Sequence, residues 1–196
     1  MPETPEELYR RAQAAFGPDG RRAMPPVHEW ETFPFEGEMR VRPLAPPVAD
    51  EAPRHGAGGV GCGRCERGDE TAIWRDERWR VVPVARPTGL PVIVILETRE
   101  HLDLPGLPDE LAAELGRLIV RVERAVSRVE GVGRVHVCRW GDGSDHFHFW
   151  FIARPARMPQ LIGSFAAIWD DVLPPTPDDV RRANLDVVAR ALAEPA

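Results

Sequence analysis

The hexapeptide His146-Phe147-His148-Phe149-Trp150-Phe151 decides the fold of this chain. Side chains alternate between the two faces of a β-strand, so the three phenylalanines share one face and the two histidines share the other with the tryptophan. We expect the phenylalanine face to lie in the core, which leaves two imidazoles about 7 Å apart on the opposite face. An imidazole that is oriented through one ring nitrogen can attack phosphorus with the other. Taken alone, the motif is more typical of two histidines that are simply packed or half-exposed on a strand.

The segments around the hexapeptide predict an α+β domain. Residues 134–140 and 146–153 have the pattern of antiparallel strands, joined by the turn Gly141-Asp-Gly-Ser-Asp145. The backbone N–H groups of such a glycine-rich turn can bind an anion. Residues 92–96 form a continuous apolar run that is typical of a strand buried on both faces. Apolar residues at spacings of three and four over 109–130 predict one long amphipathic helix.

The pair Cys62-Gly-Arg-Cys65 has the spacing with which two thiolates hold one tetrahedral zinc ion. The chain has three cysteines, so the other two ligands have to be histidine or carboxylate. His101, just after the apolar strand, and His146, at the start of its own strand, are the preferred candidates, with His55 and His136 as substitutes. A redox-active pair and two unliganded thiols are the competing interpretations, although the strand and helix that flank a thioredoxin-like motif are not indicated here.

Composition excludes several classes of protein. All 25 basic residues are arginine, and 31 acidic residues give a net charge of −6, whereas a non-specific nucleic-acid binder needs a basic face. An odd cysteine count with one close pair argues against a disulfide scaffold and for an intracellular protein. The apolar run 90–96 is far shorter than the ~20 residues of a membrane-spanning helix, and the acidic N-terminus is unlike a signal peptide. We therefore expect a cytoplasmic protein without nucleic-acid or membrane partners.

Proline divides the chain into segments. Ten of the 21 prolines precede residue 54, which predicts a proline-rich N-terminal arm with a short helix over residues 1–60. The main domain is expected over 61–175 and a C-terminal helix over 176–196. Residues 109–154, by contrast, contain no proline, as a helix and paired strands require.

Within these segments, local signals predict where helices and strands begin. Thr4-Pro-Glu-Glu7 is typical of a helix start with a capping box. Residues 29–36 and 38–42 have the composition of two short strands in the arm. Thr176 is expected to be the N-cap of the last helix, with Pro177 in its first helical position.

The order of these motifs resembles the histidine triad (HIT) superfamily. The chain has Cys62-x-x-Cys65, then Trp74-Arg-Asp-Glu-Arg-Trp79 before a buried strand, then Arg99-Glu-His101, a long helix, a strand and His146-x-His148. The resemblance covers roughly residues 62–155 and is greatest to the zinc-holding members, including the galactose-1-phosphate uridylyltransferases. It implies an α+β fold with an antiparallel sheet and one long helix, and it is compatible with a homodimer. The metal ligands it implies are Cys62, Cys65, His101 and His146.

The resemblance also implies a reaction and the residues that carry it. In the superfamily the middle histidine of the triad is the nucleophile that takes up a nucleoside monophosphoryl group, and that position is His148 here. The serine and backbone amides that bind the phosphate correspond to Ser144 and Gly143. Arg139 flanks the same place and is a further candidate phosphate ligand, or else a solvated strand end. The implied substrate is a nucleotide or nucleotide-like small molecule with a leaving group on its α-phosphate.

Two positions depart from the family pattern. Trp150 occupies the third triad position, where the family has histidine or glutamine, and an indole can donate only one hydrogen bond. Val84 stands near the place of an acidic residue that holds the ribose in many members. Two hypotheses follow. The chain is a zinc-dependent fold that acts as a nucleotide hydrolase or nucleotidyltransferase, or it is a catalytically silent HIT-like protein with a ligand-binding or structural role.

Overall fold

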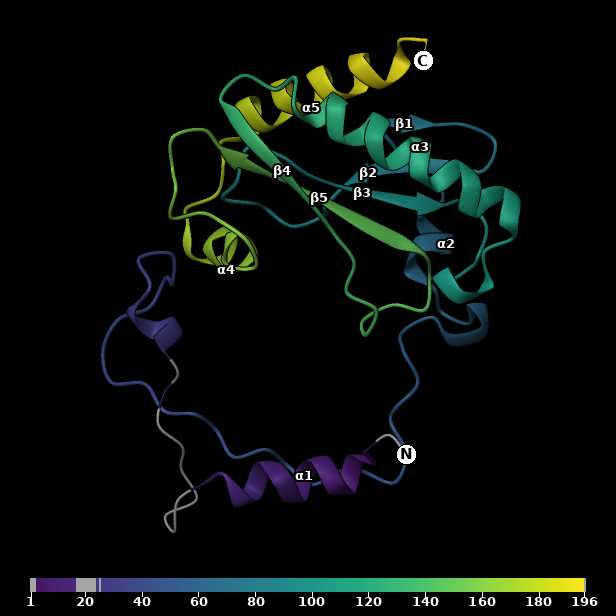
Figure 1. The fold of residues 1–196 in the computed structure, drawn as a ribbon. Coiled ribbons are helices and arrows are strands. Elements are labelled where there is room, and N and C mark those ends of the chain that lie inside the picture. The colour runs from purple at the N-terminus through teal and green to yellow at the C-terminus, as the bar shows by residue number, and fades with distance from the viewer. Residues whose placement is uncertain (1–2, 17–23, 25, 196) are drawn as a thin grey trace. The chain divides into compact units, whose positions relative to one another are not determined.

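A computed structural model of the chain describes residues 3–16, 24 and 26–195. The chain forms two compact units, Met1–Pro53 and Arg54–Ala196. The second unit carries the sheet, all the candidate site residues and most of the helices (Figure 1). None of the helices in the described ranges is both long enough and apolar enough to span a bilayer.

The first unit contains one α-helix, α1 (Pro5–Ala14), and a short 3-10 turn, η1 (Pro26–Glu29). The predicted capping box is present: the Thr4 hydroxyl accepts from the Glu7 N–H at 3.2 Å, and the Glu7 carboxylate accepts from the Thr4 N–H at 2.8 Å. The two strands expected over 29–36 and 38–42 are wrong, because the described part of this unit contains no strand. Aromatic content indicated strands there, but an extended segment interrupted by proline needs a partner strand to become one.

The second unit is built on one antiparallel sheet. Its strands are β1 (Trp74–Arg75), β2 (Trp79–Pro83), β3 (Ile93–Thr98), β4 (Val132–Cys138) and β5 (His148–Pro155). The strand order is β1-β2-β3-β5-β4, and every neighbouring pair is antiparallel. The α+β class expected from the sequence is therefore confirmed. The strand with the triad motif, β5, lies inside the sheet with a neighbour on each side.

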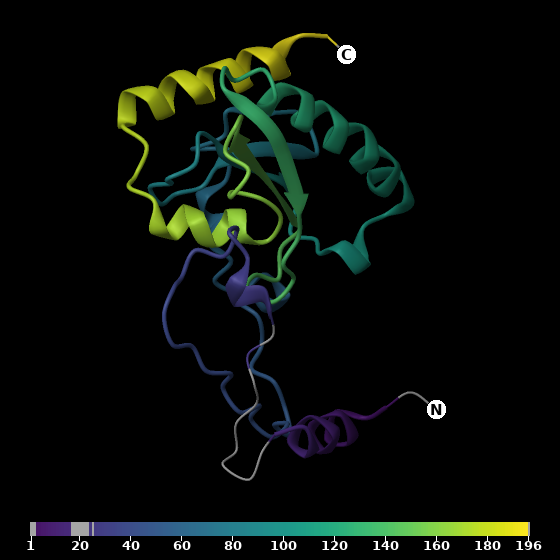
Figure 2. The same ribbon diagram turned by 60° about the vertical axis from the view of Figure 1, so that its left-hand side comes forward.

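Helices cover both faces of this sheet (Figures 1 and 2). The helices are α2 (Gly63–Arg67), α3 (Asp109–Val126), α4 (Phe165–Val172) and α5 (Asp178–Ala193), with short 3-10 turns η2 (Ala57–Gly59) and η3 (Leu104–Gly106). The long helix α3 packs with α5 over one face, and α4 lies against the other. The predicted helix over 109–130 is confirmed, although it ends at Val126, four residues early.

The phenylalanine face of β5 is part of the main core, as predicted. Phe147 and Phe151 have no exposed surface and pack with the α3 residues Leu118 and Val122. Burying an aromatic or aliphatic side chain of this kind contributes about 1.5–3 kcal/mol. This packing fixes which way β5 faces, because a slip of one residue would turn the phenylalanines outward. The histidines are thereby held on the face away from α3.

The opposite face is divided between an apolar region and a polar one. Towards one end, Ile93, Ile95 and Ile152 form a second cluster with residues of α4. The helix is held there by Asp170, whose Oδ1 accepts hydrogen bonds from the N–H groups of Gly89 (2.8 Å) and Leu90 (3.0 Å). Towards the other end, the same face carries the histidines. The apolar region therefore ends where the polar site begins.

Two boundaries differ from those the sequence predicts. The second unit starts at Arg54, not at residue 61. Arg54 forms ion pairs with Asp103 and Asp145, and His55 forms a parallel bridge with Ser144, so these residues belong to the sheet-bearing unit. The N-cap of helix α5 is Pro177, not Thr176, and no side chain caps the helix. The Thr176 hydroxyl donates instead to the carbonyl of Leu90, in the loop before β3.

Candidate functional site

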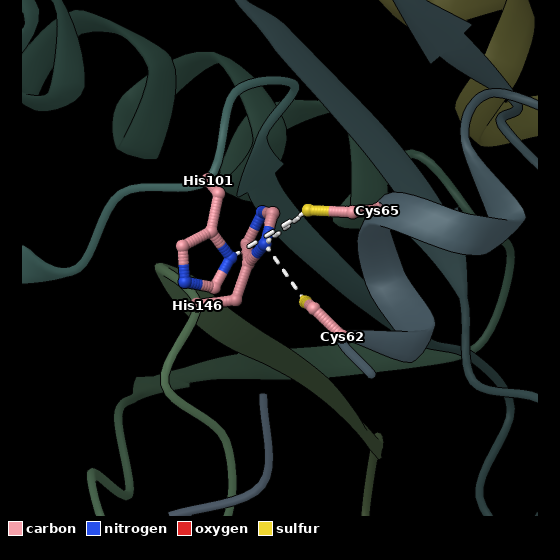
Figure 3. Close-up of side chains that lie close together, drawn as sticks. All are labelled: Cys62, Cys65, His101 and His146. Carbon is pink, nitrogen blue, oxygen red and sulfur yellow. Dashed lines mark hydrogen bonds between the residues drawn. The ribbon is translucent and has the colours of Figure 1, made fainter. Parts of the chain in front are cut away.

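Four side chains from three parts of the sequence meet at one end of the sheet (Figure 3). Cys62 is the N-cap of α2 and Cys65 lies inside that helix. His101 follows β3, and His146 precedes β5. Their potential ligand atoms all lie within 4.8 Å of one another. The structure thus brings together the four residues that spacing favoured, and the substitutes His55 and His136 are not among them.

The spacing of these atoms fits a tetrahedral metal ion. Nδ1 of His146 lies 3.5 Å from the Sγ atoms of both Cys62 and Cys65, and Nδ1 of His101 lies 3.5 Å from Sγ of Cys65. Zinc binds sulfur at about 2.3 Å and imidazole nitrogen at about 2.0–2.1 Å, so the N···S edge of a tetrahedral site is about 3.6 Å. The donor set of two thiols and two imidazoles is that of a closed structural zinc site.

Hydrogen bonds orient the histidines toward this centre. Nε2 of His146 lies 2.9 Å from the carbonyl oxygen of Thr98. A carbonyl can only accept, so Nε2 carries the proton and Nδ1 presents its lone pair to the sulfurs. Nε2 of His101 points instead towards Asp145, at 4.0 Å from Oδ2. The N–H of Phe147 donates to the carbonyl of Leu102, which ties the loop of His101 to the strand of His146.

The protonation states of the cluster make metal binding depend on pH. Burial lowers the pKa of His146, which keeps its imidazole neutral, as a ligand must be. In the metal-free cluster, partial burial and the neighbouring Cys62 raise the pKa of Cys65 to about 11. A metal ion binds the thiolate, so it has to displace that proton. Metal affinity is therefore expected to rise with pH.

His148 lies next to the metal cluster but is not part of it. It begins β5 on the polar face of the sheet and is 4 % exposed. Its Nδ1 lies 2.7 Å from the carbonyl oxygen of His146, so Nδ1 donates and Nε2 carries the lone pair. Burial lowers the pKa of His148, and the nearby cations Arg64 and Arg139 lower it further. The imidazole is thus held neutral, with Nε2 available as a nucleophile or base.

A buried carboxylate surrounded by arginines lies beside His148. Glu97 is the cross-strand partner of His148 on β3, and its side chain is completely buried. It forms ion pairs with Arg64 and Arg67 of α2 and with Arg80 of β2, the last at 2.6 Å. Three guanidinium groups around one carboxylate leave an excess of positive charge next to His148. In the sequence, the only sign of this cluster is the arginine between the two cysteines of the CxxC motif. Without the fold, that arginine is indistinguishable from a spacer residue.

The glycine-rich turn before β5 is fixed by the segment at the start of this unit. His55 donates its N–H to the carbonyl of Gly143 at 3.3 Å and accepts from the N–H of Asp145 at 2.9 Å. Arg54 donates to the carbonyl of Gly141 at 3.0 Å. The hydroxyl of Ser144, in this turn, makes no hydrogen bond with the described residues. The turn is held in place while that hydroxyl stays available.

The remaining predicted residue, Arg139, is anchored rather than solvated. Its Nη2 donates to Asp103 at 2.6 Å, and its Nε is buried without a hydrogen-bond partner. Arg54 binds the other oxygen of the same aspartate, at 2.8 Å. Burial alone would raise the pKa of Asp103, but the hydrogen bonds from Arg54, the Leu104 N–H and Arg139 lower it below its usual value. A strand end in solvent would show neither feature.

The tryptophan at the third triad position faces the same side as His148. Their ring centres lie 6.5 Å apart, and the centre of the Trp140 ring lies 5.8 Å from that of Trp150. The indole Nε1 of Trp150 is buried and has no hydrogen-bond partner. An unpaired buried N–H costs about 1–3 kcal/mol. The indole N–H of Trp150 is therefore a hydrogen-bond donor beside His148 for which the described part of the chain offers no acceptor.

The fold matches those of solved histidine triad proteins. One is a hypothetical histidine triad nucleotide-binding protein from Sulfolobus tokodaii, with a TM-score of 0.52 and 13 % identity over 67 % of this chain and 91 % of that one. Another is a histidine triad protein from Sinorhizobium meliloti, with a TM-score of 0.51 and 16 % identity over 64 % and 93 %. A zinc-bound histidine triad family protein from Mycobacterium smegmatis gives 0.49 and 22 % over 68 % and 94 %. No family model and no curated protein matches the chain. The chain has the histidine triad fold.

Proposed function

We propose that this chain is a zinc-binding nucleotide hydrolase or nucleotidyltransferase that acts at an α-phosphate through His148. The observation that carries the proposal is the hydrogen bond from Nδ1 of His148 to the carbonyl of His146, at 2.7 Å. It sets the tautomer in which Nε2 has a lone pair, and it holds the ring in place. A neutral imidazole oriented in this way is a nucleophile for phosphorus.

In the proposed reaction, Nε2 of His148 attacks the α-phosphorus and forms a P–N bond. The bond between phosphorus and the leaving group breaks, and its electron pair departs with the leaving group. Water then attacks the phosphorus of the adduct and gives up a proton to the solvent, while the P–N bond breaks and its electron pair returns to Nε2 as the lone pair. If an alcohol or a second phosphate attacks in place of water, the outcome is transfer.

Positive charge around His148 supports a phosphorylated substrate. Arg64 and Arg139 both lie near the imidazole, and the Ser144 hydroxyl in the preceding turn makes no hydrogen bond to the residues that the structure describes. We assign Ser144, Gly143 and Arg139 to the phosphoryl oxygens, where hydrogen-bond donors stabilise charge that develops in the transition state. The overall charge of −6 makes a single phosphate a better ligand for this protein than a nucleic-acid backbone.

We assign zinc to Cys62, Cys65, His101 and His146, because the donor set and the N···S distances of 3.5 Å suit it. All four tetrahedral positions are taken by protein atoms, so its role is structural. It would hold α2, and with it Arg64, against the strand that carries His148. In this proposal the zinc ion contributes to catalysis only by holding Arg64 in place beside His148.

The direct test is to incubate the full chain with adenylated and uridylated compounds and to follow its intact mass. We expect a gain of one nucleoside monophosphoryl group, which is absent in His148→Ala. The control is Val120→Ala, on the exposed side of α3, which should leave the adduct unchanged. If no compound gives an adduct or is turned over, the catalytic proposal is wrong.

A catalytically silent ligand-binding or structural role is the second candidate, and two observations favour it. Trp150 replaces the polar third residue of the triad, and His148 is only 4 % exposed. In that case the same panel would bind without turnover. Binding measured by calorimetry, together with the absence of any mass adduct, distinguishes the silent protein from the enzyme.

The resemblance on which the function rests extends to the setting of the protein. We propose that it works in the cytoplasm as a homodimer with a small nucleotide-like substrate. Light scattering of the purified chain would test the dimer: a mass of about twice 21.9 kDa is expected, and a monomer at all concentrations would contradict it.

A further inference from the structure

A cavity of about 340 Å³ opens on the same face of the sheet as His148, between the edge strand β4 and the segment that leads into α4. It lies within the range of 300–1,000 Å³ that is usual for small-molecule sites. Its lining includes His136 and Cys138 of β4, Ile152 of β5, Trp140, and Ser164 and Ala167 at α4. None of these residues belongs to the metal cluster or to the proposed phosphate site.

One polar atom in this cavity has no partner. Nε2 of His136 is buried and makes no hydrogen bond within the described residues. His136 is paired with Ile152 in the sheet, so its side chain lies on the cavity side. A buried polar atom without a partner is costly, and in native structures it marks a place where a ligand, ion or water completes the bonding. From the sequence His136 is a substitute metal ligand, but it is not among the four residues of the cluster.

Aromatic rings connect the cavity to His148. The rings of His148 and Trp150 are 6.5 Å apart, and those of Trp150 and Trp140 are 5.8 Å apart. Trp140 lines the cavity and is 46 % exposed, so part of its surface is free to stack with a ligand. The rings of His148, Trp150 and Trp140 thus form a row from the proposed nucleophile to the cavity.

The other direction from His148 along this face is closed. Val84, near which the ribose-binding acidic residue of the resembling family would fall, is only 5 % exposed. It packs in the cluster formed by Leu90, Ile93 and Leu161 with Trp169 of α4 and with Leu173, which follows that helix. A substrate whose phosphate lies at His148 has no room in that direction. A cavity of about 410 Å³ beside Cys65 is lined mainly by charged residues, among them Asp69, Arg80 and Arg99. The cavity at β4 is instead lined mainly by apolar and aromatic side chains, which suit a base.

We propose that this cavity binds the nucleobase of the substrate, with the base against Trp140 and one of its polar edge atoms bonded to Nε2 of His136. The inference rests on the proposed function, and it adds where the base lies. A planar heteroaromatic ring satisfies all three features of the cavity. It stacks on an indole, it fills an apolar floor made by Ile152 and Ala167, and it brings a ring or exocyclic nitrogen or oxygen to the imidazole. The Ser164 hydroxyl offers a second polar contact.

The experiment compares ligands with and without a base, by calorimetry on the full chain. The ligands are adenosine, guanosine, cytidine and uridine, their 5′-monophosphates, and ribose 5-phosphate. We expect at least one nucleoside and its monophosphate to bind, and ribose 5-phosphate to bind at least about tenfold more weakly than that monophosphate, a ratio of about 1.4 kcal/mol. If ribose 5-phosphate binds as well as every monophosphate, the proposal is wrong.

Three variants test the placement. His136→Phe keeps a ring but removes Nε2, and Ala167→Leu fills the cavity from α4 without touching the histidine. Both should weaken nucleoside binding at least about tenfold. Val120→Ala, on the exposed side of α3 and away from both sites, should leave it unchanged. Unaltered nucleoside affinity in both cavity variants, each checked for folding by circular dichroism, would overturn the proposal.

His148→Ala separates this inference from the proposed reaction. If it binds nucleosides as the wild type does while no compound ever forms an adduct with the wild type, the base site stands and the catalytic proposal fails. If adducts form with equal rates in wild type, His136→Phe and Ala167→Leu, catalysis stands and the base site fails.

Discussion

Two histidines separated by one residue expose opposite ring nitrogens. His146 donates from Nε2 to the carbonyl of Thr98 and turns Nδ1 towards the sulfurs, whereas His148 donates from Nδ1 to the carbonyl of His146 and leaves Nε2 free. Backbone carbonyls therefore orient the two imidazoles differently, and this difference underlies the proposed roles of His146 as metal ligand and His148 as nucleophile. The peptide of His146 connects the two roles, because a shift of that peptide would disturb both.

Removal of one cysteine should disrupt both the metal site and the fold. Cys62→Ser should lower the metal content from about one ion per chain towards zero, and it should destabilise the unit strongly. Structural zinc supplies about 10–16 kcal/mol of apparent folding energy in small zinc domains. Elemental analysis and urea denaturation measure the two effects. Cys138→Ser, outside the cluster, is the control and should keep its metal; a metal-free wild type that is fully folded would contradict the assignment.

Glu97 should make the unit sensitive to acid. Burial alone would raise the pKa of Glu97, but Arg64, Arg80 and Arg67 outweigh it and hold the pKa below 4.5. A carboxylate with a lowered folded pKa stabilises the fold above its unfolded pKa, and this contribution is lost as pH falls through the folded value.

Glu97→Gln should therefore cost about 3–5 kcal/mol at neutral pH, because Arg64 and Arg67 lose their carboxylate partner and Arg80 keeps only Asp69. The difference from wild type should shrink as the pH falls below about 4.3, the usual pKa of an unfolded glutamate, and it should vanish as the pH passes through the lowered pKa of the folded state. Urea denaturation across this range measures it, with Glu66→Gln on the exposed side of α2 as control. A difference that is small at neutral pH, or that grows towards acid, would refute this account of Glu97.

At the scale of elements, periodicity predicted the sheet and the long helix but not what surrounds the site. The alternation in β5 and the spacing of apolar residues in α3 each have a strong period, so the core face could be derived from them. Helix α2 has only five residues, too few for any period to appear. Helix α4 has Ser164 at its N-cap, but that side chain makes no capping hydrogen bond. The position of the helix depends instead on a contact with Gly89 and Leu90, about eighty residues earlier.

That contact gives a test of how α4 is held. Asp170→Ala would leave the buried N–H of Leu90 and the neighbouring N–H of Gly89 without their acceptor, which should cost about 1–3 kcal/mol. Because the carboxylate lies on α4, hydrogen exchange should speed up in 165–172 more than in the core strands. Asp171→Ala, the next residue on the exposed side, is the control. Equal stability of the two variants would show that the helix is held by other contacts.

At the scale of the molecule, the sequence predicted an arm and a domain but placed the boundary seven residues late. Glycine and proline between residues 45 and 60 are typical of a linker, and nothing local shows that Arg54 and His55 pair with residues far along the chain. Those partners, Asp103, Gly143 and Asp145, are brought near only by the fold. Local composition cannot predict pairs between residues that lie so far apart in the sequence.

Truncation tests that boundary. A chain that begins at Arg54 should keep the unfolding free energy of the sheet-bearing unit and its metal. A chain that begins at Gly61 loses the ion pairs of Arg54 and the bridge of His55, and it should be less stable by about 1–3 kcal/mol. Urea denaturation of both chains gives the comparison. Equal stability would mean that residues 54–60 contribute nothing to the unit.

The central claim, that His148 attacks phosphorus through Nε2, is tested most directly by locating the adduct. The full chain is trapped with an adenylated or uridylated compound, and the attached atom is identified by peptide mass mapping and phosphorus NMR. The account predicts one phosphoramidate, on His148, at Nε2, because Nδ1 donates to the carbonyl of His146. An adduct on another residue, an adduct at Nδ1, or turnover that persists in His148→Ala would contradict it.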